Sequence, residues 1–419
     1  MFTRIQTRAY RSLKSVDQSL GRFQALVGPN ASGKTTFLDV ISFLGDLVRG
    51  GGKVLEVVRS RSATFESLLW CEKGDSFQLA VEAKLPAAIR EKMADEMQHF
   101  VTARYEIEIG IDRAANEIGL NHEAFWLLNG VEPPALPQRE LFPAPQTSAE
   151  SILLKSGTGR KRAITNNPDG NANFYADGKK TYSPSFRLGR QTAALANLPA
   201  DRDSFVSSGW FREVLASGVQ TLTLNSNIIR KPSPPGLGLR FQTDGSNLPW
   251  VIATLRENPA HFQAWLEHVR TALEDIRDIH TVERPEDRHR YMVIEYTNGA
   301  KVPSWLVSDG TLRLLALTIP AYLSDLDGTF LIEEPENGIH PRAMETVLQS
   351  LSSIYGGQVL IATHSPVALN MLKPEEVLCF AKDANGATDI VAGHQHPALR
   401  DWKRGQPDLG ILFASGILS

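Results

Sequence analysis

The sequence predicts an α/β fold in which helices flank a mixed or parallel sheet. Three short apolar runs, at residues 25–27, 330–332 and 359–362, have the length and composition of buried strands. Each run leads at once into polar residues, which read "GPNASGKTT", "EEPEN" and "THSP", respectively. Because the carboxyl ends of parallel strands meet at one edge of a sheet, we expect these polar stretches to lie together in one site.

The stretch after the first run has the spacing of a phosphate-binding P-loop. Gly28 is followed after four residues by Gly33, Lys34 and Thr35, and apolar residues then recur at helical spacing over residues 37–47. Small residues let backbone N–H groups close around phosphate oxygens, and a helix N-terminus favours negative charge. We therefore expect Lys34 to reach the β- and γ-phosphates of a nucleotide and Thr35 to bind Mg²⁺. The other expected nucleotide contacts are Gly28, Asn30, Gly33 and Thr36.

The second run brings two adjacent carboxylates to the same edge. Glu333 and Glu334 fit the acidic position that completes a P-loop site, where one carboxylate lies beside the metal and another positions the attacking water. Adjacent residues of a strand point to opposite faces, so we expect the two to have different roles. The sequence predicts that Glu333 binds the metal and that Glu334 is catalytic.

A histidine follows the third run. His364 comes directly after the strand that we expect next in the same sheet. An imidazole at a strand end can donate a hydrogen bond to a γ-phosphate and so respond to its presence. We expect His364 to be the second catalytic residue.

A second anion-binding segment reads "SDGT" at residues 308–311. Ser308 has the position of an N-cap before a strongly apolar helix, and Gly310 leaves a backbone N–H accessible. A hydroxyl, a glycine N–H and a helix N-terminus together attract an anion. One ATP does not need two such sites from one chain. The simplest arrangement is a dimer in which Ser308 and Gly310 of each subunit close over the nucleotide of the other.

Composition limits the class of protein. The chain has 419 residues, of which 42% are hydrophobic and 22% charged, which is typical of a globular protein with two lobes or domains. A net charge of −3 argues against a uniformly basic nucleic-acid-binding surface, although local patches stay possible. Cys71 and Cys379 are the only cysteines, which excludes a disulfide framework and a cysteine-rich zinc site. The sequence lacks an apolar run of about 18 residues, so we expect a cytoplasmic protein without a membrane segment.

The chain divides into three expected parts. Residues 1–84 hold the P-loop and the first part of a nucleotide-binding head, residues 85–225 form an α+β insertion or second lobe, and residues 226–419 complete the head. Within the insertion, residues 86–100 predict a helix. Basic side chains outnumber acidic ones over residues 151–190, and we expect this segment to contact DNA, RNA or an acidic partner; the alternative is a solvated flexible loop. The basic residues are Lys155, Arg160, Lys161, Arg162, Lys179, Lys180, Arg187 and Arg190.

Four motifs, at residues 28–35, 308–311, 332–335 and 363–366, resemble those of the ABC-type ATPase heads of the RecF, SMC and OLD group. The chain is most similar to the stand-alone RecF-like or OLD-like "AAA family ATPases" of bacteria. The resemblance implies an ABC-type P-loop fold that uses ATP and Mg²⁺. It also implies phosphate binding by Lys34, metal ligation by Thr35 and Glu333, catalysis by Glu334, a signature acting in trans at Ser308 and Gly310, and a switch histidine at His364.

The resemblance further implies a switch that dimerises around ATP and hydrolyses it, in DNA repair or antiviral defence. Its expected partners are nucleic acid or a nuclease or toxin effector, since the chain after His364 is too short for the Toprim nuclease domain of OLD proteins. Glu333 replaces the usual aspartate and Asp309 the usual glycine, and either change would slow hydrolysis. One alternative is therefore a non-hydrolysing ATP-binding scaffold. Another is a transport ATPase subunit, which the insertion and the Ser-Asp-Gly signature disfavour.

Overall fold

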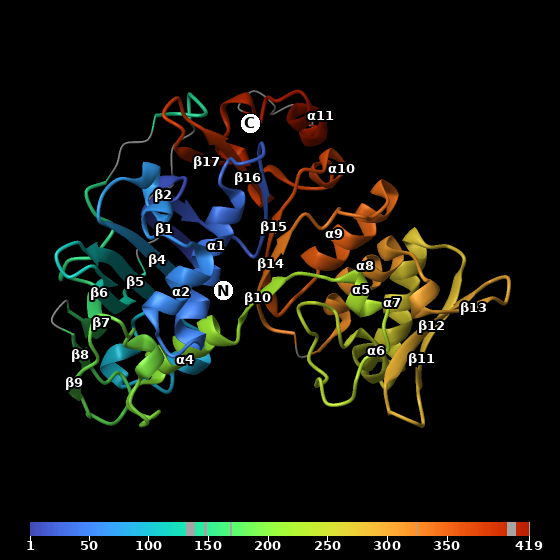
Figure 1. Ribbon diagram of the computed structural model, residues 1–419, viewed down its shortest axis with the longest axis horizontal. Coiled ribbons are helices and arrows are strands. Elements are labelled where there is room, and N and C mark those ends of the chain that lie inside the picture. The colour runs from blue at the N-terminus through green and yellow to red at the C-terminus, as the bar shows by residue number, and fades with distance from the viewer. Residues whose placement is uncertain (131–138, 146–148, 168–169, 325, 400–407, 419) are drawn as a thin grey trace.

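The computed structural model describes residues 1–419 except 131–138, 146–148, 168–169, 325, 400–407 and 419. Figure 1 shows two lobes on opposite sides of a central sheet. One lobe holds the N-terminal strands, and the other holds helices and a small sheet. Among the described residues, no helix combines the length and the apolar character that crossing a membrane requires.

The central sheet confirms the predicted mixed α/β fold. Its order is β10-β14-β15-β3-β16-β17, and every neighbouring pair is parallel except β16 and β17. The predicted strands at residues 25–27, 330–332 and 359–362 lie in β3, β14 and β15. The strands are β3 Phe23–Val27, β10 Val219–Leu222, β14 Gly328–Glu333, β15 Gly357–Ala362, β16 Val377–Lys382 and β17 Thr388–Ala392. Because β14, β15 and β3 are neighbours, their carboxyl ends meet at one edge, as expected.

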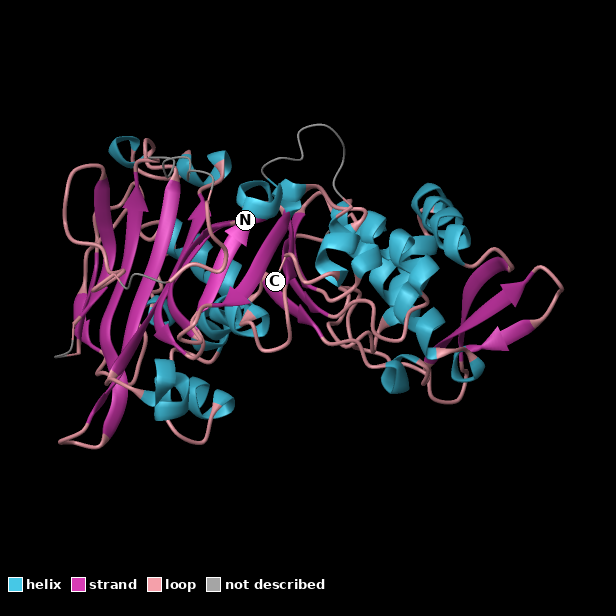
Figure 2. Ribbon diagram, turned by 90° about the horizontal axis from the view of Figure 1, so that it is seen from above, coloured by secondary structure: helices cyan, strands magenta, loops and turns pink. Residues whose placement is uncertain are grey.

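A second, antiparallel sheet forms most of the N-terminal lobe (Figure 2). Its order is β2-β1-β4-β5-β6-β7-β8-β9. The strands are β1 Phe2–Tyr10, β2 Leu13–Ser19, β4 Ser76–Lys84, β5 Thr102–Asp112, β6 Glu117–Leu128, β7 Arg160–Asn166, β8 Asn171–Phe174 and β9 Ser185–Arg187. Strand β4 pairs with β5 along the whole length of β4, and the two strands lie on either side of the boundary expected after residue 84. The strands of the expected insertion therefore extend the sheet that begins with β1.

Helices cover both faces of the central sheet. The helices are α1 Lys34–Arg49, α2 Val54–Arg61, α3 Ala87–Arg90, α4 Val206–Ala216, α5 Ser226–Ile229, α6 Leu248–Arg256, α7 Pro259–Ala272, α8 Asp309–Thr318, α9 Met344–Ser352, α10 Pro366–Leu369 and α11 Leu409–Ala414. Leu331 and Leu360 belong to the apolar core that holds α1 and the antiparallel sheet. Ile332 and Ile361 belong to the core that holds α6 to α9. Alternate residues of each strand thus anchor the two lobes to one sheet.

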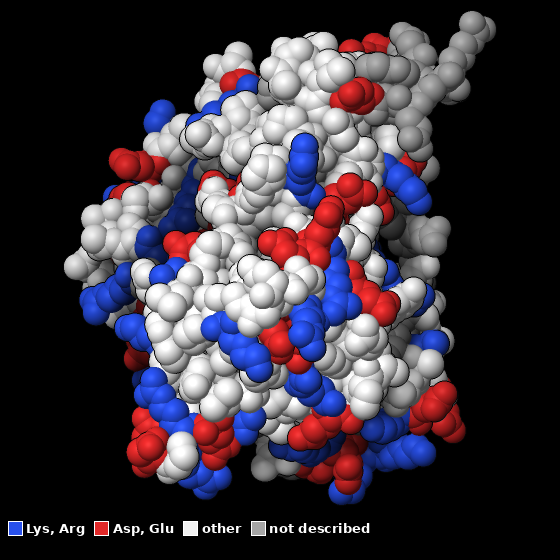
Figure 3. All heavy atoms as spheres, turned by 90° about the vertical axis from the view of Figure 1, so that its right-hand side faces the viewer, with Lys and Arg blue, Asp and Glu red and all other residues white. Residues whose placement is uncertain are grey.

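The second lobe also carries a three-stranded antiparallel sheet of β11 Ile276–Glu283, β12 Arg290–Tyr296 and β13 Lys301–Pro303. Figure 3 shows basic and acidic side chains interspersed over the face of this lobe. Several of them form ion pairs, such as Arg256 with Asp278 at 2.8 Å. This face therefore does not present the single-sign patch that a nucleic-acid-binding surface requires.

The prediction of a single helix over residues 86–100 is wrong. Helix α3 covers only Ala87–Arg90, and a single 3₁₀ turn follows at Asp95–Met97. Between them, Met93 pairs with Gly178, and the Ala94 N–H donates to the Asp177 carbonyl at 2.9 Å. The backbone of this segment thus bonds to a distant loop, which overrides a local preference for helix.

Candidate nucleotide-binding site

The P-loop joins β3 to α1 and has the backbone that its glycines allow. Gly28 and Gly33 both have positive φ, 149° and 104°. A Cβ atom at Gly28 would clash with the carbonyl of Phe380, and one at Gly33 would clash with the hydroxyl of Thr388. The Thr388 hydroxyl also donates to the Ser32 carbonyl at 2.9 Å, which anchors the loop to β17. Only glycine fits at these two positions, so the loop presents backbone rather than side chains.

Lys34 lies at the start of α1 and points back into the loop. Its Nζ atom donates to the carbonyls of Gly28 and Pro29 at 2.9 and 2.8 Å. Burial lowers the pKa of Lys34 to about 8, against the opposing effect of Glu334 and Glu333. The nearby carboxylates therefore do not fully stabilise the charged ammonium group. The phosphates of a nucleotide would supply the missing negative charge.

Thr35 and Glu333 meet across the site. The Thr35 hydroxyl donates to Glu333 Oε2 at 2.7 Å, although the two residues come from α1 and β14. A hydroxyl and a carboxylate oxygen this close form a pair of hard ligands of the kind that Mg²⁺ prefers. The donor set fits the metal that the sequence predicted, and the two residues are the ones expected to hold it.

Glu334 lies just beyond β14 and has an unusual backbone. Its φ is 47°, in the left-handed region, and its N–H donates to the carbonyl of Ala362 at the end of β15 at 2.8 Å. Non-glycine residues held in this region gather at functional sites. The Asn337 amide donates to the Glu334 carboxylate. The carboxylate is thus oriented while it stays exposed to the cavity.

Glu336 orients the histidine at the end of β15, a role that sequence reasoning missed. Glu336 Oε1 accepts from the backbone N–H of His364 at 2.7 Å and from the Thr363 hydroxyl at 2.9 Å. Burial and the nearby Lys34 lower the pKa of His364 below its ordinary value. At neutral pH the imidazole is therefore uncharged. The signal for Glu336 was present in the "EEPE" stretch as a third glutamate at the same strand end.

Most of these residues line one cavity of about 520 Å³, whereas Glu336 and the predicted nucleotide contact Gly28 are not among its lining residues. The cavity brings together most residues predicted from the sequence, namely Asn30, Gly33, Lys34, Thr35, Thr36, Glu333, Glu334 and His364. It also includes Arg11, Ser12, Cys71, Glu72 and Lys382, which sequence reasoning missed. Its volume lies within the range of small-molecule sites. Glu334 and His364 also line a neighbouring hollow of about 510 Å³, so this side of the cavity continues into a second one.

The Ser308 segment does not join this cavity within one chain, because neither Ser308 nor Gly310 lines it. Ser308 caps α8 as predicted, since its hydroxyl accepts from the Thr311 N–H at 3.2 Å. The Asp309 carboxylate forms an ion pair with Arg230, which offsets the negative charge at the signature. At Gly310, a Cβ atom would lie 2.5 Å from the carbonyl of Gly338. The segment thus packs against the turn that follows Glu334.

Cys71 offers a chemical test of the cavity. Cys71 is exposed and lines the cavity, whereas Cys379 is buried in β16, where burial raises the pKa of its thiol to about 12. We expect maleimide to modify Cys71 and to spare Cys379 in the folded protein, because the thiolate is the reactive form. Mg²⁺-ATP is expected to slow the modification of Cys71, as followed by mass spectrometry, with Cys71→Ser as the control. An equal rate with and without ATP would mean that the nucleotide binds elsewhere.

Comparisons with known proteins agree with this geometry. A family model described as "AAA domain, putative AbiEii toxin, Type IV TA system" matches residues 23–89 and 143–370. A search of curated proteins found no match. Among solved structures, the chain is similar to an SmcHead bound to the C-winged helix domain of ScpA, with 13% identity and a TM-score of 0.50 over 93% of this chain and 96% of that chain. This likeness supports the fold.

Two other SMC heads are more distant in structure. An Smc head domain with an extended coiled coil, bound to the C-terminal domain of ScpA derived from Pyrococcus furiosus, has 12% identity and a TM-score of 0.48 over 93% of this chain and 95% of that chain. The SMC head domain from Thermotoga maritima has 11% identity and a TM-score of 0.37 over 93% and 98%. The family model covers well over half of the chain and includes the P-loop, the glutamates and the histidine. The chain therefore belongs to this AAA-domain family and is an ATP-binding ATPase with an ABC-type P-loop fold.

Proposed function

We propose that the chain is a molecular switch that closes as a homodimer around ATP and opens when it hydrolyses the nucleotide. The observation that carries this proposal is the contact between Thr35 and Glu333, 2.7 Å apart, in a cavity that also holds Lys34, Glu334 and His364. A P-loop, a pair of metal ligands and an oriented carboxylate are the parts that phosphoryl transfer to water requires.

Five side chains of the cavity then have a role in hydrolysis. Lys34 and the N–H groups at the start of α1 bind the phosphates. Thr35 and Glu333 would hold Mg²⁺, which would supply positive charge to the phosphate oxygens. Glu334 orients a water molecule, whose oxygen bonds to the γ-phosphorus as the bond to the ADP oxygen breaks. His364 donates a hydrogen bond from its imidazole to a γ-phosphate oxygen. ADP and inorganic phosphate leave, and the water proton passes to solvent by way of Glu334 or the phosphate.

The position of the Ser308 segment supports the proposed dimer. The segment stands outside its own cavity, while Glu334 and His364 also line the neighbouring hollow. Next to Ser308, Leu306 is 71% exposed and Trp305 is 40% exposed, which is apolar surface that a second subunit could cover. Because Arg230 neutralises Asp309, the N-terminus of α8 can face the phosphates of a partner subunit.

The native mass of the Glu334→Gln protein tests this proposal. The variant retains the residues that bind ATP and loses the carboxylate that orients water, so it should accumulate the ATP-bound state. We expect two chains per particle with Mg²⁺-ATP and one chain without nucleotide. Glu345→Gln, on the exposed side of α9, serves as the control and should not accumulate dimer. A monomer under both conditions would contradict the dimer.

We propose antiviral defence with a partner effector, rather than DNA repair, as the setting of this switch. The description of the family refers to a toxin of a toxin–antitoxin system, which supports an effector over a repair role. We also propose, as the sequence predicted, that the chain is related to OLD proteins and lies in the cytoplasm. The alternative, a non-hydrolysing scaffold, would bind ATP but would not turn it over.

Nucleic acid is a second proposed partner, bound at the exposed start of β7. Arg160, Lys161 and Arg162 are all exposed there, and the Arg162 guanidinium also lies 4.7 Å from the centre of the Trp126 ring, so its substitution would disturb packing as well as charge. We expect Arg160→Glu with Lys161→Glu to weaken DNA or RNA binding and to lower the slope of log affinity against log salt by about 2, because each cation releases about one counterion. Binding measured by fluorescence anisotropy across a salt series checks this. An unchanged slope would remove β7 from the interface.

A further inference from the structure

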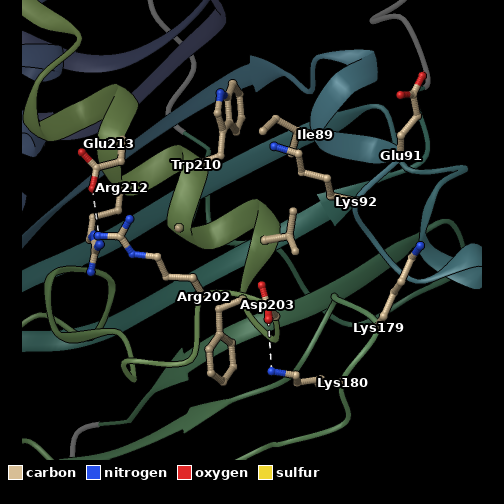
Figure 4. Close-up of a pocket in the computed structure, with 13 residues that line it drawn as sticks. Ile89, Glu91, Lys92, Lys179, Lys180, Arg202, Asp203, Trp210, Arg212 and Glu213 are labelled. Carbon is tan, nitrogen blue, oxygen red and sulfur yellow. Dashed lines mark hydrogen bonds and ion pairs between the residues drawn. The ribbon is translucent and has the colours of Figure 1, made fainter.

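The N-terminal lobe contains a second cavity, of about 740 Å³, that shares no lining residue with the nucleotide cavity. Figure 4 shows it between α3, α4 and the loop that carries Lys179 and Lys180. Three segments far apart in the sequence form its walls, near residues 89–92, 179–180 and 202–213. We call this cavity the α4 groove.

The floor of the α4 groove is apolar. Trp210 and Ile89 project into the same space from α4 and α3 (Figure 4), and Phe205 and Val206 continue the floor. Trp210 is half-buried, so part of its ring faces the groove. Tryptophan in a groove is a frequent anchor of protein interfaces, because it buries a large area at a small entropic cost.

The rim of the α4 groove carries cations without partners. Lys92, Lys179 and Arg202 are exposed, and their side chains make no hydrogen bond or ion pair among the described residues. Two further cations there are already paired. Lys180 contacts Asp203 at 3.1 Å, and Arg212 contacts Glu213 at 3.3 Å. Three positive charges therefore stay available to a ligand, and all lie at the edge of the apolar floor.

Asp177 holds the walls of the groove together. Its carbonyl accepts from the Ala94 N–H after α3, and its own N–H donates to the Ser204 carbonyl, both at 2.9 Å. Its carboxylate accepts from the N–H groups of Val206 and Ser207 at the start of α4, at 2.7 and 3.0 Å. One buried residue thus connects all three walls. A groove fixed in this way loses little entropy when a ligand binds.

We propose that the α4 groove binds an acidic segment of a partner protein that inserts an apolar side chain beside Trp210. Charge complementarity favours carboxylates over the unpaired cations, and the apolar floor requires an apolar anchor. Of the acidic residues that line the groove, Asp203 and Glu213 are paired with Lys180 and Arg212, which leaves Glu91 against the three unpaired cations. A nucleic-acid strand fits less well, because it has no aliphatic side chain to place on the apolar floor. The groove offers one partly exposed aromatic ring, whereas strands usually stack on several.

Selection from a random-peptide display library against the full chain tests the proposal. We expect the enriched peptides to combine Asp or Glu with a Leu, Phe or Trp. Their dissociation constant, measured by fluorescence anisotropy, should rise at least about tenfold, which is about 1.4 kcal/mol, in the triple variant Lys92→Glu, Lys179→Glu, Arg202→Glu. The matched control is Arg59→Glu, Lys84→Glu, Lys231→Glu, which makes the same charge change at exposed sites away from the groove and should leave binding unchanged.

Two further variants distinguish peptide binding in the α4 groove from a failure of the nucleotide site. Trp210→Ala should weaken peptide binding and Trp210→Phe should restore most of it. Lys34→Met should leave it intact, so a failure of the nucleotide site would not mimic a failure of the groove. The proposal is overturned if the library yields no enriched acidic peptide or if the triple variant binds as wild type does. It is also overturned if a labelled oligothymidylate binds the groove more tightly than the peptides.

Discussion

Lys34→Met is expected to abolish the ATPase activity, with a fall in turnover of roughly 10²- to 10³-fold. The ammonium group is the cation that we expect to bind the phosphates, and among the described residues it donates to the carbonyls of Gly28 and Pro29. Methionine has a similar length and cannot donate a hydrogen bond. Phosphate release measured with Mg²⁺-ATP checks the turnover, and equilibrium binding of labelled ATP checks the affinity, which should fall as well.

Loss of activity in this variant should not come from unfolding. Burial lowers the pKa of Lys34 to about 8, below its value in an unfolded chain. The charged form therefore costs stability below about pH 8, and this cost disappears as the pH rises through the unfolded-state pKa. Removing the charge should leave the melting temperature at pH 7 unchanged or raised. Lys53→Met, at an exposed lysine paired with Glu56, is the control. Wild-type turnover in the Lys34 variant would refute the assignment of the cavity.

Glu334→Gln is expected to lower turnover by roughly 10²- to 10³-fold while ATP binding stays close to wild type. Glutamine can still accept a hydrogen bond from Asn337, but it cannot take a proton and orients water less well than a carboxylate. The two losses therefore differ, because Lys34→Met lowers both binding and turnover. Binding of labelled ATP and release of phosphate, measured on the same preparation, check the difference.

Glu345→Gln is the matched control for this change as well, and it should turn over ATP at the wild-type rate. Equal rates for wild type and Glu334→Gln would remove Glu334 from catalysis. If both rates were also negligible, the chain would be a non-hydrolysing scaffold. In that case the longer Glu333, in place of the usual aspartate, would be the first residue to examine.

The nucleotide cavity could be predicted in large part from the sequence, because its residues follow directly on three buried strands. A strand that is buried on both faces reads as an apolar run, and a parallel sheet brings the ends of such runs to one edge. The P-loop, Glu333, Glu334 and His364 therefore appeared as local patterns. The Ser308 cap appeared for the same reason, since an N-cap is a local feature.

Other features depend on contacts between distant segments and left no local pattern. Arg230 approaches Asp309 across more than seventy residues of chain, and Cys71 reaches the cavity through the packing of short turns. The helix predicted over residues 86–100 ends after α3, because Met93 and Ala94 pair with residues 177–178. The extent of the antiparallel sheet was missed because hydrogen bonds between strands far apart in sequence decide where a sheet stops. The division of the chain into a head and an insertion at residues 84 and 225 stays a prediction.

A mixing experiment tests whether the Ser308 segment of one subunit completes the nucleotide site of the other. Lys34→Met removes the P-loop cation, and Ser308→Arg blocks the signature, so each variant alone should be inactive. In a mixed dimer, one site combines an intact P-loop from the Ser308→Arg chain with an intact Ser308 from the Lys34→Met chain. We predict that mixing the two inactive proteins restores ATP hydrolysis. If the mixture stays as inactive as its parts, or if Ser308→Arg alone turns over ATP at the wild-type rate, the site in trans is contradicted.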